Sequence, residues 1–117
     1  MSMSDYKPRR CSKRWLDGDC PREVLAIMDS GPKNFDRYTV FYTDAVRDGR
    51  DVWIGYRGMS EHPSSPMGFG VSGQLRAHEV AEYRYRFKHQ YIRWSDLPHD
   101  VQETVRRDCK LISESED

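Results

Sequence analysis

Alternating apolar and polar positions mark the clearest element of the chain, a β-hairpin. Residues 37–46 and 51–57 are rich in β-branched and aromatic side chains, and Asp48-Gly49 lies between them. Asp-Gly is typical of a two-residue hairpin turn, because both central positions of that turn need a positive φ. We therefore predict a hairpin over residues 37–57.

The same alternation predicts which hairpin side chains share a face of the sheet. One face would carry Phe41, Thr43 and Ala45 together with Val52, Ile54 and Tyr56, and the other would carry Val40, Tyr42 and Trp53. Neither set is fully polar. A bulge of one residue would exchange the two sets.

Helical spacing predicts a first helix over about residues 21–30. Asp19 or Cys20 can cap it, Pro21 suits the first helical position, and Gly31-Pro32 would end it. Its apolar stripe consists of Val24, Leu25, Ile27 and Met28. A helix this short is unstable alone in water, so we expect its stripe to dock on the sheet.

A second helix is predicted to start near residue 98 and to run to about residue 110. Ser95-Asp96-Leu97-Pro98 provides the start signal. The predicted buried positions are Val101, Val105 and Cys109, spaced i, i+4 and i+8, followed by Leu111 and Ile112.

Residues 83–94 fit two different periods. Aromatic and basic side chains alternate there, with Tyr83, Tyr85, Phe87 and Tyr91 on one face and Arg84, Arg86 and Lys88 on the other. This period of two predicts a third strand. Val80, Tyr83, Phe87 and Tyr91 are also spaced like one face of a helix, so a helix over residues 76–89 is the alternative.

Residues 58–75 hold four Gly and two Pro and show neither period, which predicts a long structured loop packed across the sheet. Gly68 to Gly73 match G-x-G-x-x-G. A dinucleotide site needs a hydrophobic strand before the first glycine and a helix after the last, and two prolines precede this match instead. We interpret the glycines as turn positions with positive φ that let Phe69 pack closely.

These elements predict one small α+β domain, in which an antiparallel sheet made of the hairpin 37–57 and a strand near residues 83–94 packs against two helices. We assign residues 15–112 to this domain. Residues 1–14 are predicted to be a mobile basic arm, and residues 113–117 a mobile acidic tail.

Charge and composition narrow the possible functions of this 117-residue chain. Its 19 Lys and Arg balance 19 Asp and Glu, which argues against a protein whose main task is to coat nucleic acid. The hydrophilic start and the lack of a long apolar run predict a cytoplasmic protein without a membrane segment. The three cysteines fit no paired framework, so we expect free thiols.

Residues with catalytic or metal-binding chemistry occur without a matching pattern. The four histidines, His62, His78, His89 and His99, are irregularly spaced, and no C-x-x-C pair accompanies them. His62 has Ser64, Ser65 and Ser72 as sequence neighbours, but nothing fixes a base, a nucleophile and an orienting group together. We expect no catalytic residues, no metal and no cofactor.

Binding of another macromolecule remains, and the sequence offers two candidate surfaces. The first would bind a protein through exposed aromatic and Met side chains, with Trp53, Met59, Met67 and Phe69 as contact residues and Tyr42 as a further aromatic. The second would bind nucleic acid weakly through Arg9, Arg10, Arg84, Arg86, Lys88 and Arg93. In a strand, alternate cations stand about 7 Å apart, near the phosphate repeat of an extended single strand.

Two segments carry a resemblance to known proteins. They are residues 56–63, Tyr-Arg-Gly-Met-Ser-Glu-His-Pro, continuing through residues 66–70, and residues 92–98, Ile-Arg-Trp-Ser-Asp-Leu-Pro, continuing through residues 100–102. Both resemble segments of short, mostly uncharacterised proteins of tailed phages and other bacterial mobile elements. The resemblance covers about a quarter of the chain and implies no catalytic residues. It implies an accessory phage protein that binds or inhibits a host factor.

Overall fold

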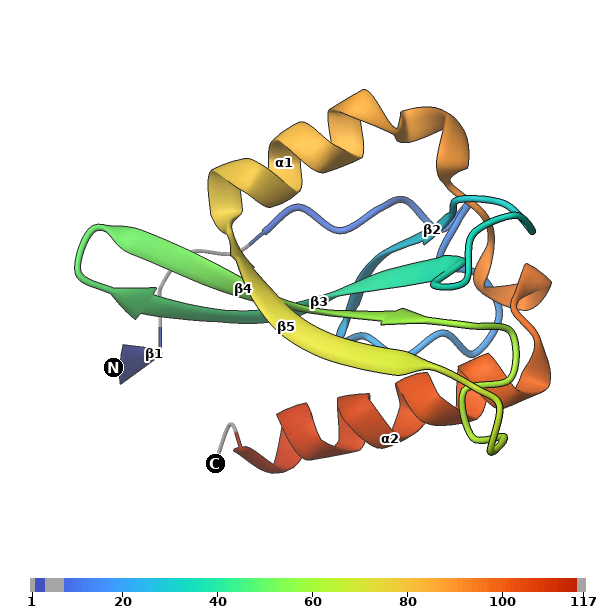
Figure 1. Cartoon of the computed structure of the whole chain (residues 1–117). Coiled ribbons are helices and arrows are strands. Elements are labelled where there is room, and N and C mark those ends of the chain that lie inside the picture. The colour runs from blue at the N-terminus through green and yellow to red at the C-terminus, as the bar shows by residue number, and fades with distance from the viewer. Residues whose placement is uncertain (1, 4–7, 116–117) are drawn as a thin grey trace.

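The computed structural model of the chain describes residues 2–3 and 8–115, and it places an antiparallel sheet between two helices (Figure 1). The strands are β1 (Ser2–Met3), β2 (Val24–Asp29), β3 (Tyr38–Asp48), β4 (Asp51–Met59) and β5 (Gly70–Arg76). The helices are α1 (Ala77–Arg86) and α2 (His99–Ser115), with short 3-10 turns at Lys88–Gln90 and Trp94–Asp96. The predicted α+β class is confirmed.

β3 and β4 form the predicted hairpin. Asp48 pairs with Asp51, so Gly49 and Arg50 make the turn, one residue later than predicted. Gly49 has a φ of 64°, the left-handed conformation that favours glycine at such a turn.

An irregularity in β3 leaves the predicted faces intact. Three residues of β3 lie between the Phe41–Tyr56 and Ala45–Ile54 pairs, against one residue of β4, so β3 carries two extra residues there. An even number of extra residues keeps each side chain on its face, because side chains alternate with a period of two. Phe41, Ala45 and Ile54 accordingly share one buried cluster.

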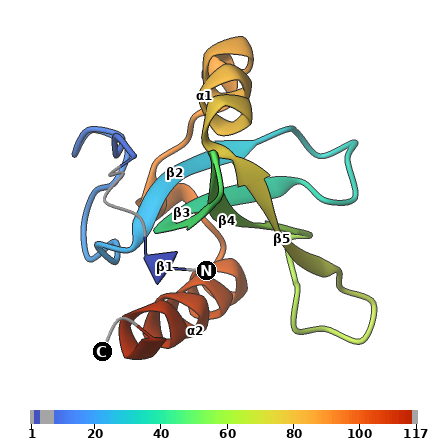
Figure 2. The same cartoon turned by 90° about the vertical axis from the view of Figure 1, so that its left-hand side faces the viewer.

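Figure 2 shows α1 and α2 on opposite faces of the sheet. A hydrophobic core lies under each helix. β3 is central, with β4 on one side and β2 and β1 on the other, and β5 pairs with β4. The core under α2 contains Val24, Ile27, Tyr38, Val40, Tyr42, Met59, Trp94, Val101, Val105 and Cys109. The core under α1 contains Leu25, Ala26, Met28, Phe41, Ala45, Ile54 and Val80.

The predicted helix over residues 21–30 is wrong, because this segment forms strand β2. Residues 24–28 are all apolar and all nearly inaccessible to solvent. A strand between two helix layers has to be apolar on both faces, and such a continuous run also satisfies helical spacing by chance. The apparent cap at Asp19 to Pro21 belongs to a turn before the strand.

The predicted strand near residues 83–94 is also wrong, and the alternative helix is the one that forms. α1 turns Val80 into the core, and Tyr83 and Phe87 pack against the same cluster. The strand that extends the hairpin is instead β5, which begins inside the predicted loop 58–75 and ends one residue beyond it. α2 confirms the predicted helix and its buried face, with Val101, Val105 and Cys109 buried. It runs to Ser115 rather than ending near residue 110, and Leu111 is 65% exposed rather than packed in the core.

Residues 60–69 form the tip of a second hairpin between β4 and β5, so the predicted packing of the whole loop across the sheet is wrong. Among the described residues, the glycines with positive φ are Gly18, Gly31 and Gly49, so the prediction of positive φ within Gly68 to Gly73 is wrong too. Gly68 has another reason to be glycine, because a Cβ there would lie 1.9 Å from the His62 carbonyl oxygen.

The segment of residues 9–19 runs along the β2 edge of the sheet and is hydrogen-bonded to β2 and to Trp94. Arg10 Nε donates to the Val24 carbonyl over 2.8 Å. The Trp94 N–H donates to the Trp15 carbonyl over 2.8 Å, and the Trp94 indole donates to Asp19 over 2.9 Å. Residues 1 and 4–7 of the predicted arm and residues 116–117 of the predicted tail lie outside the described part of the chain.

Candidate functional site

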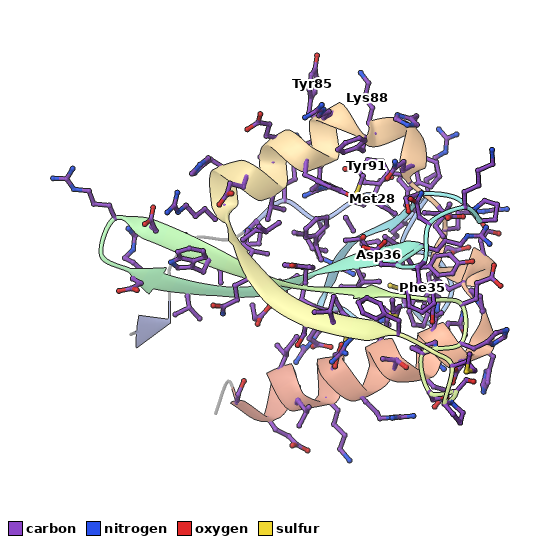
Figure 3. The ribbon with its side chains drawn as sticks, in the orientation of Figure 1. Met28, Phe35, Asp36, Tyr85, Lys88 and Tyr91 are labelled. Atoms are coloured by element: carbon purple, nitrogen blue, oxygen red, sulfur yellow. The ribbon has the colours of Figure 1, made fainter. Side chains whose placement is uncertain are left out.

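Exposed apolar side chains gather at one end of the molecule, where the loop between β2 and β3 meets the tip of the β4–β5 hairpin. Phe35 is 63% exposed, Met67 is 86% exposed and Phe69 is 36% exposed. The rings of Phe35 and Phe69 contact each other with centroids 5.2 Å apart. Figure 3 shows Phe35 at this end of the ribbon. We name these three residues the Phe35–Phe69 patch.

An open cleft of about 550 Å³ lies beside the patch. Its walls come from both loops, and its lining includes Lys33, Phe35, Arg37, Glu61, His62 and Met67. Large apolar groups therefore border a concavity that also offers charged side chains of both signs. This combination of an aromatic anchor and a polar rim is typical of surfaces that bind proteins.

Arg37 holds the two loops in position. Its Nε and one Nη donate to the two carboxylate oxygens of Asp29, over 2.8 and 2.9 Å, and its other Nη donates to Glu61 in the hairpin tip. The guanidinium also stacks over the Tyr38 ring. Hydrogen bonds from Arg37 hold the pKa of Asp29 below its usual range, and Asp29 in turn raises the pKa of Arg37.

The hairpin tip is fixed by its own serines. Ser60 Oγ accepts the Phe69 N–H over 2.9 Å, and Ser65 Oγ accepts the Met67 N–H over 3.3 Å. The Ser64 hydroxyl and N–H both donate to Asp100 at the start of α2, and these bonds hold the pKa of Asp100 below its usual range. The serines near His62 are therefore engaged in loop structure.

The residues predicted to contact a protein do not all reach one surface. Met67 and Phe69 belong to the patch, whereas Met59 is fully buried in the core under α2. Tyr42, predicted as an exposed aromatic, is 4% exposed. Trp53 pairs with Arg76 at the far end of β5, where the Arg76 guanidinium lies 5.3 Å from the Trp53 ring centroid.

The sequence interpretation missed Phe35 and Arg37. Phe35 is a single aromatic in a short polar run between two strands, which is the one signal the sequence offers for an exposed anchor. Arg37 shows no such signal, because its partners Asp29 and Glu61 come together only when three strands assemble.

The basic residues predicted to bind nucleic acid are separated by the fold. A helical turn places Arg84 and Arg86 about 200° apart around α1, so the stripe expected of a strand does not form. Arg84 is half-buried and donates to Tyr91, to Cys11 and to the Arg9 carbonyl. Lys88 lies over the exposed Tyr85 ring, and both point away from the body of the molecule (Figure 3).

The remaining predicted cations have neighbours of their own. Arg10 donates to the carbonyls of Val24 and Pro21, and Arg93 pairs with Asp96 over 3.4 Å. The Arg86 guanidinium lies 5.4 Å from the Phe87 ring centroid.

A second groove lies between α2 and strands β3, β4 and β5. The Asp108 carboxylate on α2 accepts the Tyr42 hydroxyl over 2.6 Å and two donors of the Arg57 guanidinium over 2.5 and 2.9 Å. Burial, with the Asp108 charge next, raises the pKa of Tyr42 above its usual range, and the hydrogen bond to Asp108 raises the pKa of Arg57. This network ties α2 to the sheet.

Other chemistry is sparse in the described residues. Within residues 2–3 and 8–115, no group of three or more His, Cys, Asp or Glu side chains is arranged to hold a metal ion. Cys11, Cys20 and Cys109 are free thiols, and burial raises the pKa of Cys20 and of Cys109 to about 12. Over the same residues, the helices fall short of the apolar length that a bilayer crossing needs.

The chain was compared with models of known protein families, with curated proteins and with solved structures, and none of them matches it.

Proposed function

We propose that this protein is a non-enzymatic interaction module that binds a protein partner through the Phe35–Phe69 patch and the cleft beside it. The observation that carries the proposal is the contact between two phenylalanine rings, from two separate loops, that both remain exposed. Apolar rings inside a domain bury their surface, so a pair of rings in contact on the outside offers apolar area to another molecule.

The rigidity of the two loops supports the same function. Arg37 ties Asp29 to Glu61, and Ser64 ties the hairpin tip to Asp100. A surface that is ordered before binding loses less conformational entropy when the partner arrives. The free energy of contact at the aromatic rings then appears as affinity, and these rings are the expected hot spots.

The partner belongs to the cytoplasm in this proposal, where the three cysteines would stay reduced. The resemblance of residues 56–63, 66–70, 92–98 and 100–102 to proteins of tailed phages points to a bacterial host factor as that partner. The proposed role is then to occupy or inhibit that factor by binding it.

The proposal is tested by affinity capture from bacterial lysate with the wild type and with the variant Phe35→Ala/Met67→Ala. Both side chains are mostly exposed, so their removal should leave stability nearly unchanged. Tyr85→Ala is the matched control, because Tyr85 is 75% exposed on α1, away from the patch.

We expect the wild type and Tyr85→Ala to capture the same proteins, and we expect the double variant to fail to capture them. Loss of the Phe35 ring and of the exposed Met67 side chain should weaken the captured complex by at least about 30-fold when it is measured by calorimetry. An identical set of captured proteins for all three forms would refute the proposed surface.

A further inference from the structure

The outer edge of β5 differs from the other outer edge of the sheet. Along β2, the Cys11 N–H donates to the Leu25 carbonyl, the Ile92 N–H donates to the Ile27 carbonyl, and Tyr91 bridges Met28. β5 pairs with β4 on one side, and among the described strands no other lies against it. Figure 1 shows β5 in front of the sheet, between the two helices.

The hydrogen-bond register fixes which backbone groups face outward from β5. The Ser60 N–H donates to the Phe69 carbonyl, so Phe69 directs its backbone groups toward β4. In an antiparallel ladder every second residue does the same, which assigns Val71, Gly73 and Leu75 to β4 as well. The N–H and C=O groups of Gly70, Ser72 and Gln74 therefore point away from the sheet.

These outward groups are symmetric about Ser72. In an antiparallel pair of two β5 strands centred there, Ser72 faces Ser72 of the other copy and Gly70 faces Gln74. Every outward N–H then meets an outward C=O of the other copy, because Gly70, Ser72 and Gln74 are two positions apart and each faces another residue of this set. Arg76 ends the pairing, since its N–H already donates to Glu79.

The side chains of β5 also complement themselves in this register. Val71, which is 44% exposed, would face Gly73 of the other copy. A Cβ on Gly73 would lie 3.1 Å from the Tyr56 ring, so this ring lies beside the space that the facing valine would enter. At each end of the pairing Phe69 would face Leu75, an apolar pair.

Charge favours the same arrangement. Residues 70–75 contain no ionisable side chain, so two copies bring no like charges together across the seam. Edge strands are commonly protected by charged residues or proline, and β5 has neither between Gly70 and Leu75. The exposed Leu111 on α2 lines the groove beside Ser72 and Gln74, which adds apolar surface next to the seam.

We propose that this protein forms a symmetric dimer in which β5 of one copy pairs antiparallel with β5 of a second copy about an axis at Ser72. The two sheets become one continuous sheet, and both copies of α2 lie on the same face of it. The proposal does not depend on the Phe35–Phe69 patch, although Phe69 belongs to both surfaces. A seam of one short strand is small for an interface, so we expect a dissociation constant in the micromolar range.

The test is sedimentation velocity over a micromolar concentration series with the wild type, Ser72→Pro and Ser72→Ala. Proline removes the outward N–H of Ser72 and needs an extended backbone, which an edge strand supplies, so the monomer should fold. Ser72→Ala keeps the N–H and is the matched control. We expect wild type and Ser72→Ala to dimerise equally and Ser72→Pro to remain monomeric, with a dissociation constant raised at least tenfold.

A second variant decides the matter even if Ser72→Pro fails to fold. Val71→Lys places two like charges diagonally across the seam on an exposed site, and Tyr85→Lys adds the same charge on α1 as a control. We expect Val71→Lys alone to weaken the dimer, and to regain part of its affinity at high salt. A wild type that stays monomeric at the highest concentration, or a dimer that survives Val71→Lys, would overturn the proposal.

Discussion

Replacing Asp108 by Ala should destabilise the fold strongly, and more than removal of the Glu103 carboxylate from the same helix. Asp108 accepts from the Tyr42 hydroxyl and from two donors of Arg57, and the Asp108 and Arg57 side chains are only 14% and 24% exposed. Removing one partner of a buried ion pair costs about 3–5 kcal/mol, because the other charge stays buried without its partner. Water can reach part of Arg57, so we reduce the expected loss to about 2–4 kcal/mol.

The loss is measurable by urea and by thermal unfolding. An unfolding entropy of about 2.1 cal/mol/K per residue, over 117 residues, corresponds to about 4 °C of Tm per kcal/mol, so Tm should fall by about 8–16 °C. Tyr42→Phe should cost less, about 1–2 kcal/mol, because it removes one hydrogen bond to a charge and leaves no donor without an acceptor.

Glu103→Ala is the matched control, because it removes a carboxylate from the same helix. Glu103 pairs with Arg106 over 2.8 Å, but both side chains are more than a third exposed, so the expected change is below about 0.5 kcal/mol. If Asp108→Ala changes the free energy of unfolding no more than Glu103→Ala does, the network is not what holds α2 to the sheet.

Two further results are expected from the loops around the patch. Gly68→Ala should lower Tm and open the hairpin tip to amide exchange, because its Cβ would clash with the His62 carbonyl. Gly70→Ala is the control and should change Tm little, because its Cβ meets only ordinary contacts. Equal effects of the two variants would contradict the packing argument. Arg37 depresses the pKa of Asp29 in the folded state, so this pair stabilises the fold above the unfolded pKa of about 4 and the contribution is lost as pH falls through the folded pKa. Asp29→Asn should therefore flatten the acid limb of the curve of unfolding free energy against pH, and an unchanged limb would refute this assignment.

The parts of the fold that the sequence predicted correctly depend on local signals. The Asp48-Gly49 pair marked the hairpin turn to within one residue, because glycine is required where φ is positive. The apolar spacing of Val101, Val105 and Cys109 predicted the buried face of α2, because the opposite face of this helix is exposed to solvent.

The errors occur where tertiary burial overrides the local pattern. β2 is covered by a helix layer on each face, so its apolar run carries no period that separates strand from helix. In β5, Gly73 takes the place of the apolar side chain that would have completed the alternation between Val71 and Leu75. α1 showed one usable signal that the strand prediction overlooked, which is Glu79 placed to accept the Arg76 N–H at the start of the helix.

The candidate site shows a similar division. Met67 and Phe69 could be predicted as exposed contact residues because they interrupt a polar, glycine-rich segment. The contact between the Phe69 and Phe35 rings could not, because it joins two loops 34 residues apart that only the order of the strands brings together. Burial of Met59 follows from its place at the last residue of β4, facing α2 rather than the loop.

The hydrogen bonds between the start of the chain and residues 94–95 have a consequence for the order of folding. Asp19 accepts a hydrogen bond from the Trp94 indole, and Asp17 accepts hydrogen bonds from Ser95. The partners are separated by 75 positions in the first case and by 78 in the second. Closing so large a loop loses chain entropy before any contact repays it, so such contacts form late. Until α2 has been made, the face of β2 that carries Val24 and Ile27 lacks the helix that covers it. Residues 17–19 are therefore secured only after residues 94–95 have been made, and the protein is most prone to aggregate in the interval before that.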